Sequence, residues 1–217
     1  MNQPINKVFV IGLPRTGTKS LHTVLSQLGY RSHHHPGEFR FLQLNGEFQF
    51  PGQWDALCGF GVGIYPQLDE NYPNSRFILT MRNKDDWLKS MKWKHGRRPD
   101  TRIGSQTRID IFGCQRFNAQ RYSYVFDQHY KNVVGYFSNM QEKLLILDIG
   151  GRGNMDKLCA FLEKESLALD FPITNTRGEL EKRSFRVLFT KKVRMIIADF
   201  RFLLKERRYD RRKKKAN

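Results

Sequence analysis

A short apolar segment that runs into a glycine-containing loop constrains the fold of this chain more than any other feature. Residues 7–12 read KVFVIG, and LPRTGTKSL follows directly. An apolar, β-branched run of this length is typical of a buried parallel strand. From Thr18 to Leu28, leucine and valine recur at helical spacing, and Gly29 supplies a stop signal. The pattern predicts strand, loop and helix in immediate succession.

The rest of the chain continues this alternation of strand and helix patterns. We expect strands at 30–35, 75–82 and 143–149, and helices at 18–28, 84–94, 116–140 and 155–163. Such alternation favours an α/β fold, here a three-layer sandwich with a mostly parallel sheet of about five strands. We predict one α/β domain over residues 1–177. A basic, amphipathic helical extension and tail would then occupy residues 178–217.

The loop is suited to an anion. Free N–H groups and the positive dipole end of a helix would lie at its carboxyl-terminal side, near Thr18. Positive and hydroxyl side chains surround this point, namely Arg15, Thr16, Thr18, Lys19 and Ser20. The alternative is a tight turn without a ligand. Because strand, loop, helix and basic residues coincide, we favour phosphate binding.

The loop departs from the ATP-binding motif G-x-x-x-x-G-K-[ST] in one respect. Gly12 and Gly17 have the required spacing, but Thr18 stands where that motif has lysine. Lys19 and Ser20 come one position later. The mismatch suggests a loop that binds a different anionic ligand.

A second motif, RFILTMRNKDDWLKS, ends a predicted strand with a cation. Nucleotide triphosphatases use an Asp at a comparable strand to hold Mg²⁺, whereas this strand ends at Arg82, and Ser90 follows on the next predicted helix. Arg82 and Ser90 are thereby able to bind one phosphate together. The alternatives are a surface ion pair for Arg82 and a solvated helix face for Ser90.

These residues together resemble the sulfotransferases that use 3'-phosphoadenosine 5'-phosphosulfate (PAPS). PRTGTKSL is similar to their 5'-phosphosulfate loop, and RFILTMRNKDDWLKS to their 3'-phosphate motif, including the interval from arginine to serine. FPITN, residues 171–175, resembles the end of the core in one subgroup. The resemblance covers residues 7–175 and implies a P-loop nucleotide-binding fold.

The resemblance also implies roles. Arg15 would contact the phosphosulfate and offset charge on the bridging oxygen during catalysis. Arg82 and Ser90 would hold the 3'-phosphate, with Arg177 as a further cation. The 5'-phosphate would lie in the loop made by Pro14, Arg15, Thr16, Gly17, Thr18, Lys19 and Ser20. PAPS would be the sulfuryl donor, the acceptor a hydroxyl or amine, and no metal would be needed.

The general base is less defined, because its motif is not matched. Asp55 in QWDALCGF lies between the two motifs and precedes a strand or loop. The cluster RSHHHP offers His33, His34 and His35, since histidine exchanges protons near neutral pH. We take Asp55 and His33 as the catalytic candidates. His95 and His129 are weaker ones.

Charge is concentrated at the carboxyl-terminal end. Residues 179–217 carry 15 Lys and Arg against 5 Asp and Glu, which is +10 of the chain's +17. A predicted helix at 180–208 has an apolar stripe, which would pack on the fold, pair with a second subunit in a homodimer, or lie on an anionic membrane. Nucleic acid is disfavoured because aromatic residues are not interleaved with the last basic cluster. An acidic or membrane-associated acceptor would fit this charge.

Two other functions remain open at this stage. A small-molecule kinase would use Mg-ATP, and the run LLILD ending at Asp148 favours it. A non-catalytic binding protein would use the basic tail on membranes or nucleic acid. We expect a cytoplasmic protein, with peripheral membrane contact as a further option, because the chain starts directly with the predicted strand. Its three cysteines are odd in number and far apart, which suggests reduced thiols.

Overall fold

The core of the protein is one parallel sheet. The computed structural model describes residues 5, 7–34, 53–59, 62–95, 102–166 and 171–172 of the 217. Five strands pair in the order β2-β3-β1-β4-β5, and every pairing is parallel. The strands are β1 (Val8–Val10), β2 (Ser32–His34), β3 (Ala56–Cys58), β4 (Arg76–Met81) and β5 (Leu144–Asp148). This confirms the α/β class and the expected five-stranded sheet.

Helices cover both faces of the sheet. They are α1 (Thr18–Gln27), α3 (Tyr65–Asn71), α4 (Lys84–His95), α5 (Arg102–Phe112), α6 (Ala119–Tyr136), the 3₁₀ turn η1 (Gln141–Lys143) and α7 (Asn154–Phe161). The strand β3 lies where the sequence indicated a strand or loop after Asp55, whereas the helices α3 and α5 go beyond the sequence prediction. Helix α6 is shorter at both ends than the predicted 116–140. No helix in the described part of the chain is long and apolar enough to cross a membrane.

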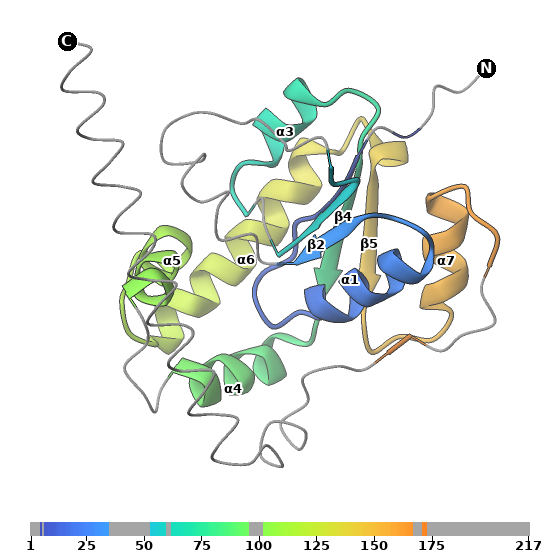
Figure 1. The fold of residues 1–217 in the computed structure, drawn as a ribbon. Coiled ribbons are helices and arrows are strands. Elements are labelled where there is room, and N and C mark those ends of the chain that lie inside the picture. Colours follow the sequence, from blue (N-terminus) through green and yellow to red (C-terminus); the bar gives the residue numbers. More distant parts are fainter. Residues whose placement is uncertain are drawn as a thin grey trace, which may run out of the picture.

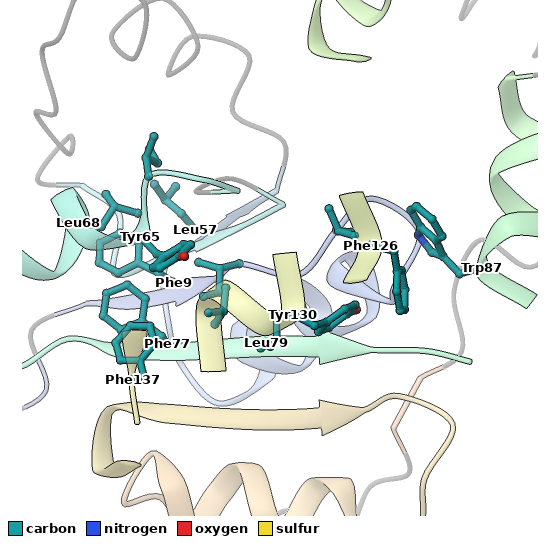
Figure 2. Close-up of a cluster of buried hydrophobic side chains, with 14 of the residues drawn as sticks. Phe9, Leu57, Tyr65, Leu68, Phe77, Leu79, Trp87, Phe126, Tyr130 and Phe137 are labelled. Atoms are coloured by element: carbon teal, nitrogen blue, oxygen red, sulfur yellow. The ribbon is translucent and has the colours of Figure 1, made fainter. Parts of the chain in front are cut away.

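Two apolar clusters, one on each face of the sheet, give the three layers. Side chains of α1 and α7 pack against one face, centred on Val10, Ile78 and Leu147. On the other face α3, α4 and α6 pack over β1 and β4 (Figure 1). Figure 2 labels part of this second cluster: Phe9, Leu57, Tyr65, Leu68, Phe77, Leu79, Trp87, Phe126, Tyr130 and Phe137.

The strand order locates a crevice. From β1 the chain proceeds to β2 and β3 on one side, and then crosses to β4 and β5 on the other. In parallel α/β sheets, ligands bind outside the carboxyl ends of the strands at the point where the strand order reverses. Here that point lies between β1 and β4. The glycine loop follows β1, and Arg82 follows β4.

Some predictions fall on residues outside this description. They concern His35 near the amino-terminal end and, at the carboxyl-terminal end, most of FPITN, Arg177 and the whole of residues 178–217. The division at residue 177 and the basic amphipathic helix therefore stay predictions.

Candidate functional site

The loop between β1 and α1 is packed tightly against β4. The Thr16 hydroxyl donates to the carbonyl of Leu13 at 2.7 Å, and its oxygen lies 2.6 Å from the Thr80 hydroxyl. Since the Thr16 proton goes to a carbonyl, Thr80 is the donor in the second contact. A Cβ on Gly12 would lie 1.8 Å from the Thr80 oxygen. Glycine is therefore required at position 12 for the loop to reach β4.

The second glycine of the loop starts α1. Gly17 has a φ of 95°, in the left-handed region that favours glycine, and forms the N-cap of α1 without a side-chain hydrogen bond. The next turn contains Thr18 and Ser20, both buried. The first N–H groups of a helix have no partner within the helix and attract anions. The start of α1 therefore provides the backbone donors that the sequence predicted.

Arg15 and Arg82 meet beyond the carboxyl ends of the strands β1 and β4. Arg15 has a φ of 72°, which is strained for a residue other than glycine. Its Nε donates to Ser90 Oγ at 3.0 Å, and Arg82 Nη1 approaches the Arg15 carbonyl at 3.5 Å. Burial and the nearby Arg82 guanidinium lower the pKa of Arg15. Within the described residues neither guanidinium pairs with a carboxylate, so the positive charge there is available to an anion.

Helix α4 holds the second motif against the loop. Asn83 starts the helix, with its Oδ1 accepting from the backbone N–H groups of Asp85 and Asp86. Trp87 is fully buried, and its indole N–H donates to the Pro14 carbonyl at 2.8 Å. Ser90 follows one turn later on the same helix. The tryptophan thus fixes the distance between loop and helix, a role that the sequence did not reveal.

Of the described histidines, His34 lies at the loop. It ends β2, and its Nε2 is 3.2 Å from the Thr18 hydroxyl at the start of α1. The ring of His22 on α1 lies 5.8 Å from the ring of His34. His33 instead stacks on Trp54 with a centroid distance of 4.7 Å. Alternation along β2 places these two histidines on opposite faces of the sheet, and His34 contacts the start of α1 through its hydrogen bond with Thr18.

Asp55 lies at the amino ends of the strands, the ends opposite to the loop. Its backbone carbonyl accepts from the N–H of Val8, the first residue of β1, whereas the loop follows the last residue of that strand. Both carboxylate oxygens accept from Arg31, at 2.9 and 2.7 Å. Hydrogen bonding from Arg31 lowers the pKa of Asp55 to about 2. A carboxylate this weakly basic and this far from the loop does not suit the predicted role of general base.

The remaining candidates have other partners. His129 on α6 is 7 % exposed, and its Nε2 bonds to the Ile11 carbonyl at 2.9 Å. His95 ends α4, where its Nδ1 lies 3.3 Å from Arg108 Nη1. Asp148, at the end of β5, accepts from the Gly150 N–H at 3.1 Å and so caps a turn. Among the described residues, no group of three His, Cys, Asp or Glu is arranged to hold a metal.

Comparison with known protein families gives one match over most of the chain. Residues 7–180 match the model of the sulfotransferase domain. This range contains the loop, Arg82 and Ser90, and it ends close to the predicted boundary at residue 177.

Two individual proteins are also similar. Ava biosynthesis cluster protein M of Aspergillus versicolor is 29 % identical over 112 residues, which cover 40 % of this chain and 42 % of that protein. The match thus spans about two fifths of the length of that curated relative. The crystal structure of a sulfotransferase from Alicyclobacillus acidocaldarius superposes with a TM-score of 0.51 at 18 % identity. It covers 91 % of this chain and 96 % of the other, and at this identity the likeness concerns the fold.

Proposed function

This chain belongs to the sulfotransferase domain family, and on that premise we propose that it transfers a sulfuryl group from PAPS to a hydroxyl or amine. Adenosine 3',5'-bisphosphate would be the second product. The observation that carries the proposal is the meeting of Arg15 with Arg82 and Ser90 beside the amino-terminal end of α1. Two motifs far apart in sequence thereby form one positively charged surface, which suits a ligand with two phosphorylated ends.

Each end of the donor has a counterpart in this arrangement. Arg82 and Ser90 bind the 3'-phosphate, the group that distinguishes PAPS from ATP. The N–H groups at the start of α1, with the hydroxyls of Thr18 and Ser20, bind the 5'-phosphate. Lys19 and the buried Thr16 shape the loop around it. Arg177 remains a candidate third cation for the 3'-phosphate.

Arg15 is the residue best placed to assist the chemical step. The acceptor oxygen or nitrogen attacks sulfur, and the bond between sulfur and the bridging oxygen breaks. The electron pair of that bond passes to the bridging oxygen of the departing bisphosphate. The Arg15 guanidinium offsets the negative charge that develops there, a stabilisation that acts strongly in a partly buried site. Its hydrogen bond with Ser90 links this charge to the 3'-phosphate end.

His34 takes the role of general base in this proposal. A base must lie within hydrogen-bond reach of the acceptor, and the acceptor must lie in line with the phosphosulfate. Through Thr18, His34 lies at the start of α1, where the phosphosulfate would sit. Its imidazole accepts the acceptor proton as the new bond to sulfur forms. The carboxylate of Asp55 is instead paired with Arg31, and the ring of His33 stacks on Trp54.

Calorimetric titration with adenosine 3',5'-bisphosphate, compared with ATP with and without Mg²⁺, tests the proposal. We expect the bisphosphate to bind equally well in the presence of EDTA. Arg82→Ala should weaken binding about 10- to 100-fold, as expected for one or two charged hydrogen bonds. Arg31→Ala removes the same charge at the amino ends of the strands, away from the loop, and serves as the matched control. A Mg²⁺-dependent preference for ATP would indicate the kinase instead, and no binding of either nucleotide would favour the non-catalytic binding protein.

A further inference from the structure

Helix α6 presents two consecutive polar side chains to the two strands that carry the site. His129 Nε2 bonds to the carbonyl of Ile11, the residue directly before Gly12 of the loop, at 2.9 Å. The Tyr130 hydroxyl donates to the carbonyl of Thr80, two residues before Arg82, at 2.8 Å. One helix therefore contacts both strand ends from which the site's two motifs begin.

Both donors carry, near neutral pH, the proton that these contacts need. The carbonyl of Ile11 can only accept, so His129 carries its proton on Nε2. Burial lowers the pKa of His129 to about 4, which leaves the ring neutral at physiological pH. Burial also raises the pKa of Tyr130, and the nearby Asp148 carboxylate adds to the effect. The two hydrogen bonds are therefore constant features of the folded protein near neutral pH.

Apolar packing alone does not require polar groups at these positions. His129 and Tyr130 are 7 % and 9 % exposed, and polar groups this buried cost free energy unless their partners are well placed. Val133, one turn further along α6, packs in the same cluster with an apolar side chain. Figure 2 shows Tyr130 against β4 beside Leu79, and Phe126 near Trp87. The same face of α6 thus also supports the tryptophan that donates to Pro14.

The contacts made by Thr80 complete the connection. Its carbonyl accepts from Tyr130, while its side-chain hydroxyl donates to Thr16 inside the loop. A displacement of α6 would consequently be felt at Ile11, at Thr80 and, through Thr80, at Thr16. Ligand-binding groups gain affinity when surrounding residues fix them before the ligand arrives.

We propose that His129 and Tyr130 are positioning residues that fix the glycine loop relative to Arg82, so that both ends of the bisphosphate are met without rearrangement. The proposal deepens the function given above and rests on it for the identity of the ligand. The effect is distinct from support of the core, because it acts on two particular carbonyls at the site. The proposal predicts that loss of these hydrogen bonds speeds hydrogen exchange in the loop and weakens ligand binding more than an equal loss of apolar packing does.

Four variants separate positioning from packing. His129→Leu removes the donor to Ile11, His129→Gln offers an amide N–H in its place, and Tyr130→Phe removes only the hydroxyl. Val133→Ala removes apolar contacts from the same helix and leaves both hydrogen bonds in place. The first measurement is hydrogen exchange of the unliganded proteins over residues 11–20 and 76–82. We expect faster exchange there in His129→Leu and Tyr130→Phe than in Val133→Ala, and recovery in His129→Gln.

The second measurement is the dissociation constant for adenosine 3',5'-bisphosphate. His129→Leu and Tyr130→Phe should each weaken binding about five-fold, since a hydrogen bond contributes about 1 kcal/mol. His129→Gln should regain most of the loss, and Val133→Ala should bind as the wild type does. Exchange and affinity that change no more than in Val133→Ala would overturn the positioning role. If the wild type fails to bind the bisphosphate, the proposed function is wrong, and the exchange data still decide whether α6 positions the loop.

Discussion

Arg15 and Ser90 are 75 positions apart in the chain, and the Arg15 Nε donates a hydrogen bond of 3.0 Å to the Ser90 Oγ. The contact joins the loop after β1 to the middle of α4. Arg15 reaches it from a left-handed backbone conformation, which costs about 1–3 kcal/mol and has to be stabilised by its surroundings. The Trp87 hydrogen bond to Pro14 lies next to it on the same helix. The two motifs therefore form one unit.

Replacement of Ser90 tests this unit. Ser90→Ala removes the partner of Arg15 and the hydroxyl that we propose binds the 3'-phosphate, so we expect bisphosphate binding to weaken about 10-fold or more. Ser26→Ala is the control, because that exposed hydroxyl bonds only locally, to the His22 carbonyl on α1. Calorimetry gives both values. Equal affinities for the two variants would show that Ser90 does not take part in binding.

His34, the base proposed from the structure, and Asp55, a base candidate from the sequence, lead to opposite predictions. His34→Asn should lower kcat about 100-fold or more, the usual contribution of a general base, with a smaller effect on bisphosphate binding. Asp55→Asn should leave kcat within about two-fold of the wild-type value, because Asp55 pairs with Arg31 at the amino ends of the strands, away from the loop. Steady-state kinetics with an accepted substrate decide between them. A large loss in Asp55→Asn, in protein that stays folded, would return the role to that carboxylate.

The reason why sequence alone suggested Asp55 is instructive. The residue adjoins a strand that lies between the two motifs, and its carboxylate is a common type of base. However, Asp55 precedes β3, whereas His34 ends β2. In a parallel sheet, residues that precede the strands and residues that follow them lie at opposite ends of the strands, and ligands bind at the carboxyl ends. The boundary of a three-residue strand therefore decides which residue is available.

Other features differ in how far they can be read from sequence. The apolar runs of β4 and β5 are clear in pattern, although only β4 is largely buried and Ile146 of β5 is exposed. The spacing of Arg15, Arg82 and Ser90 follows a motif. The strand β3 has three residues and α3 has seven, too few to establish a period. The bond from His129 to Ile11 spans 118 positions and depends on how α6 packs across the sheet. Contacts of this kind come from tertiary structure and leave no local signal.

Glycine substitutions test the close approach of loop and strand. Gly12→Ala would place a Cβ 1.8 Å from the Thr80 hydroxyl, so it should lower the free energy of unfolding by about 1–3 kcal/mol and weaken bisphosphate binding. Gly135→Ala lies on α6 with open space at the Cβ position, and should stabilise by about 0.5–1 kcal/mol. Urea denaturation measures both. If Gly12→Ala matches Gly135→Ala in stability, the loop does not pack on Thr80 as described.

The pH dependence of stability offers a direct test of the buried His129. Its pKa is lowered to about 4, while the unfolded chain would protonate it near its ordinary value of 6.5. Its full contribution to stability is therefore present above pH 6.5 and is lost as the pH falls towards 4, because only the unfolded state gains the proton over that interval. The loss should reach about 2 kcal/mol at pH 5.

The variant His129→Gln has no proton to gain in this pH range. The effects of other titrating groups therefore cancel when its stability is compared with that of the wild type. Urea denaturation at pH 7.5 and pH 5 should show the stability difference between the two proteins move in favour of His129→Gln by about this amount. A difference that stays constant with pH would mean that His129 is accessible to solvent and that burial does not lower its pKa.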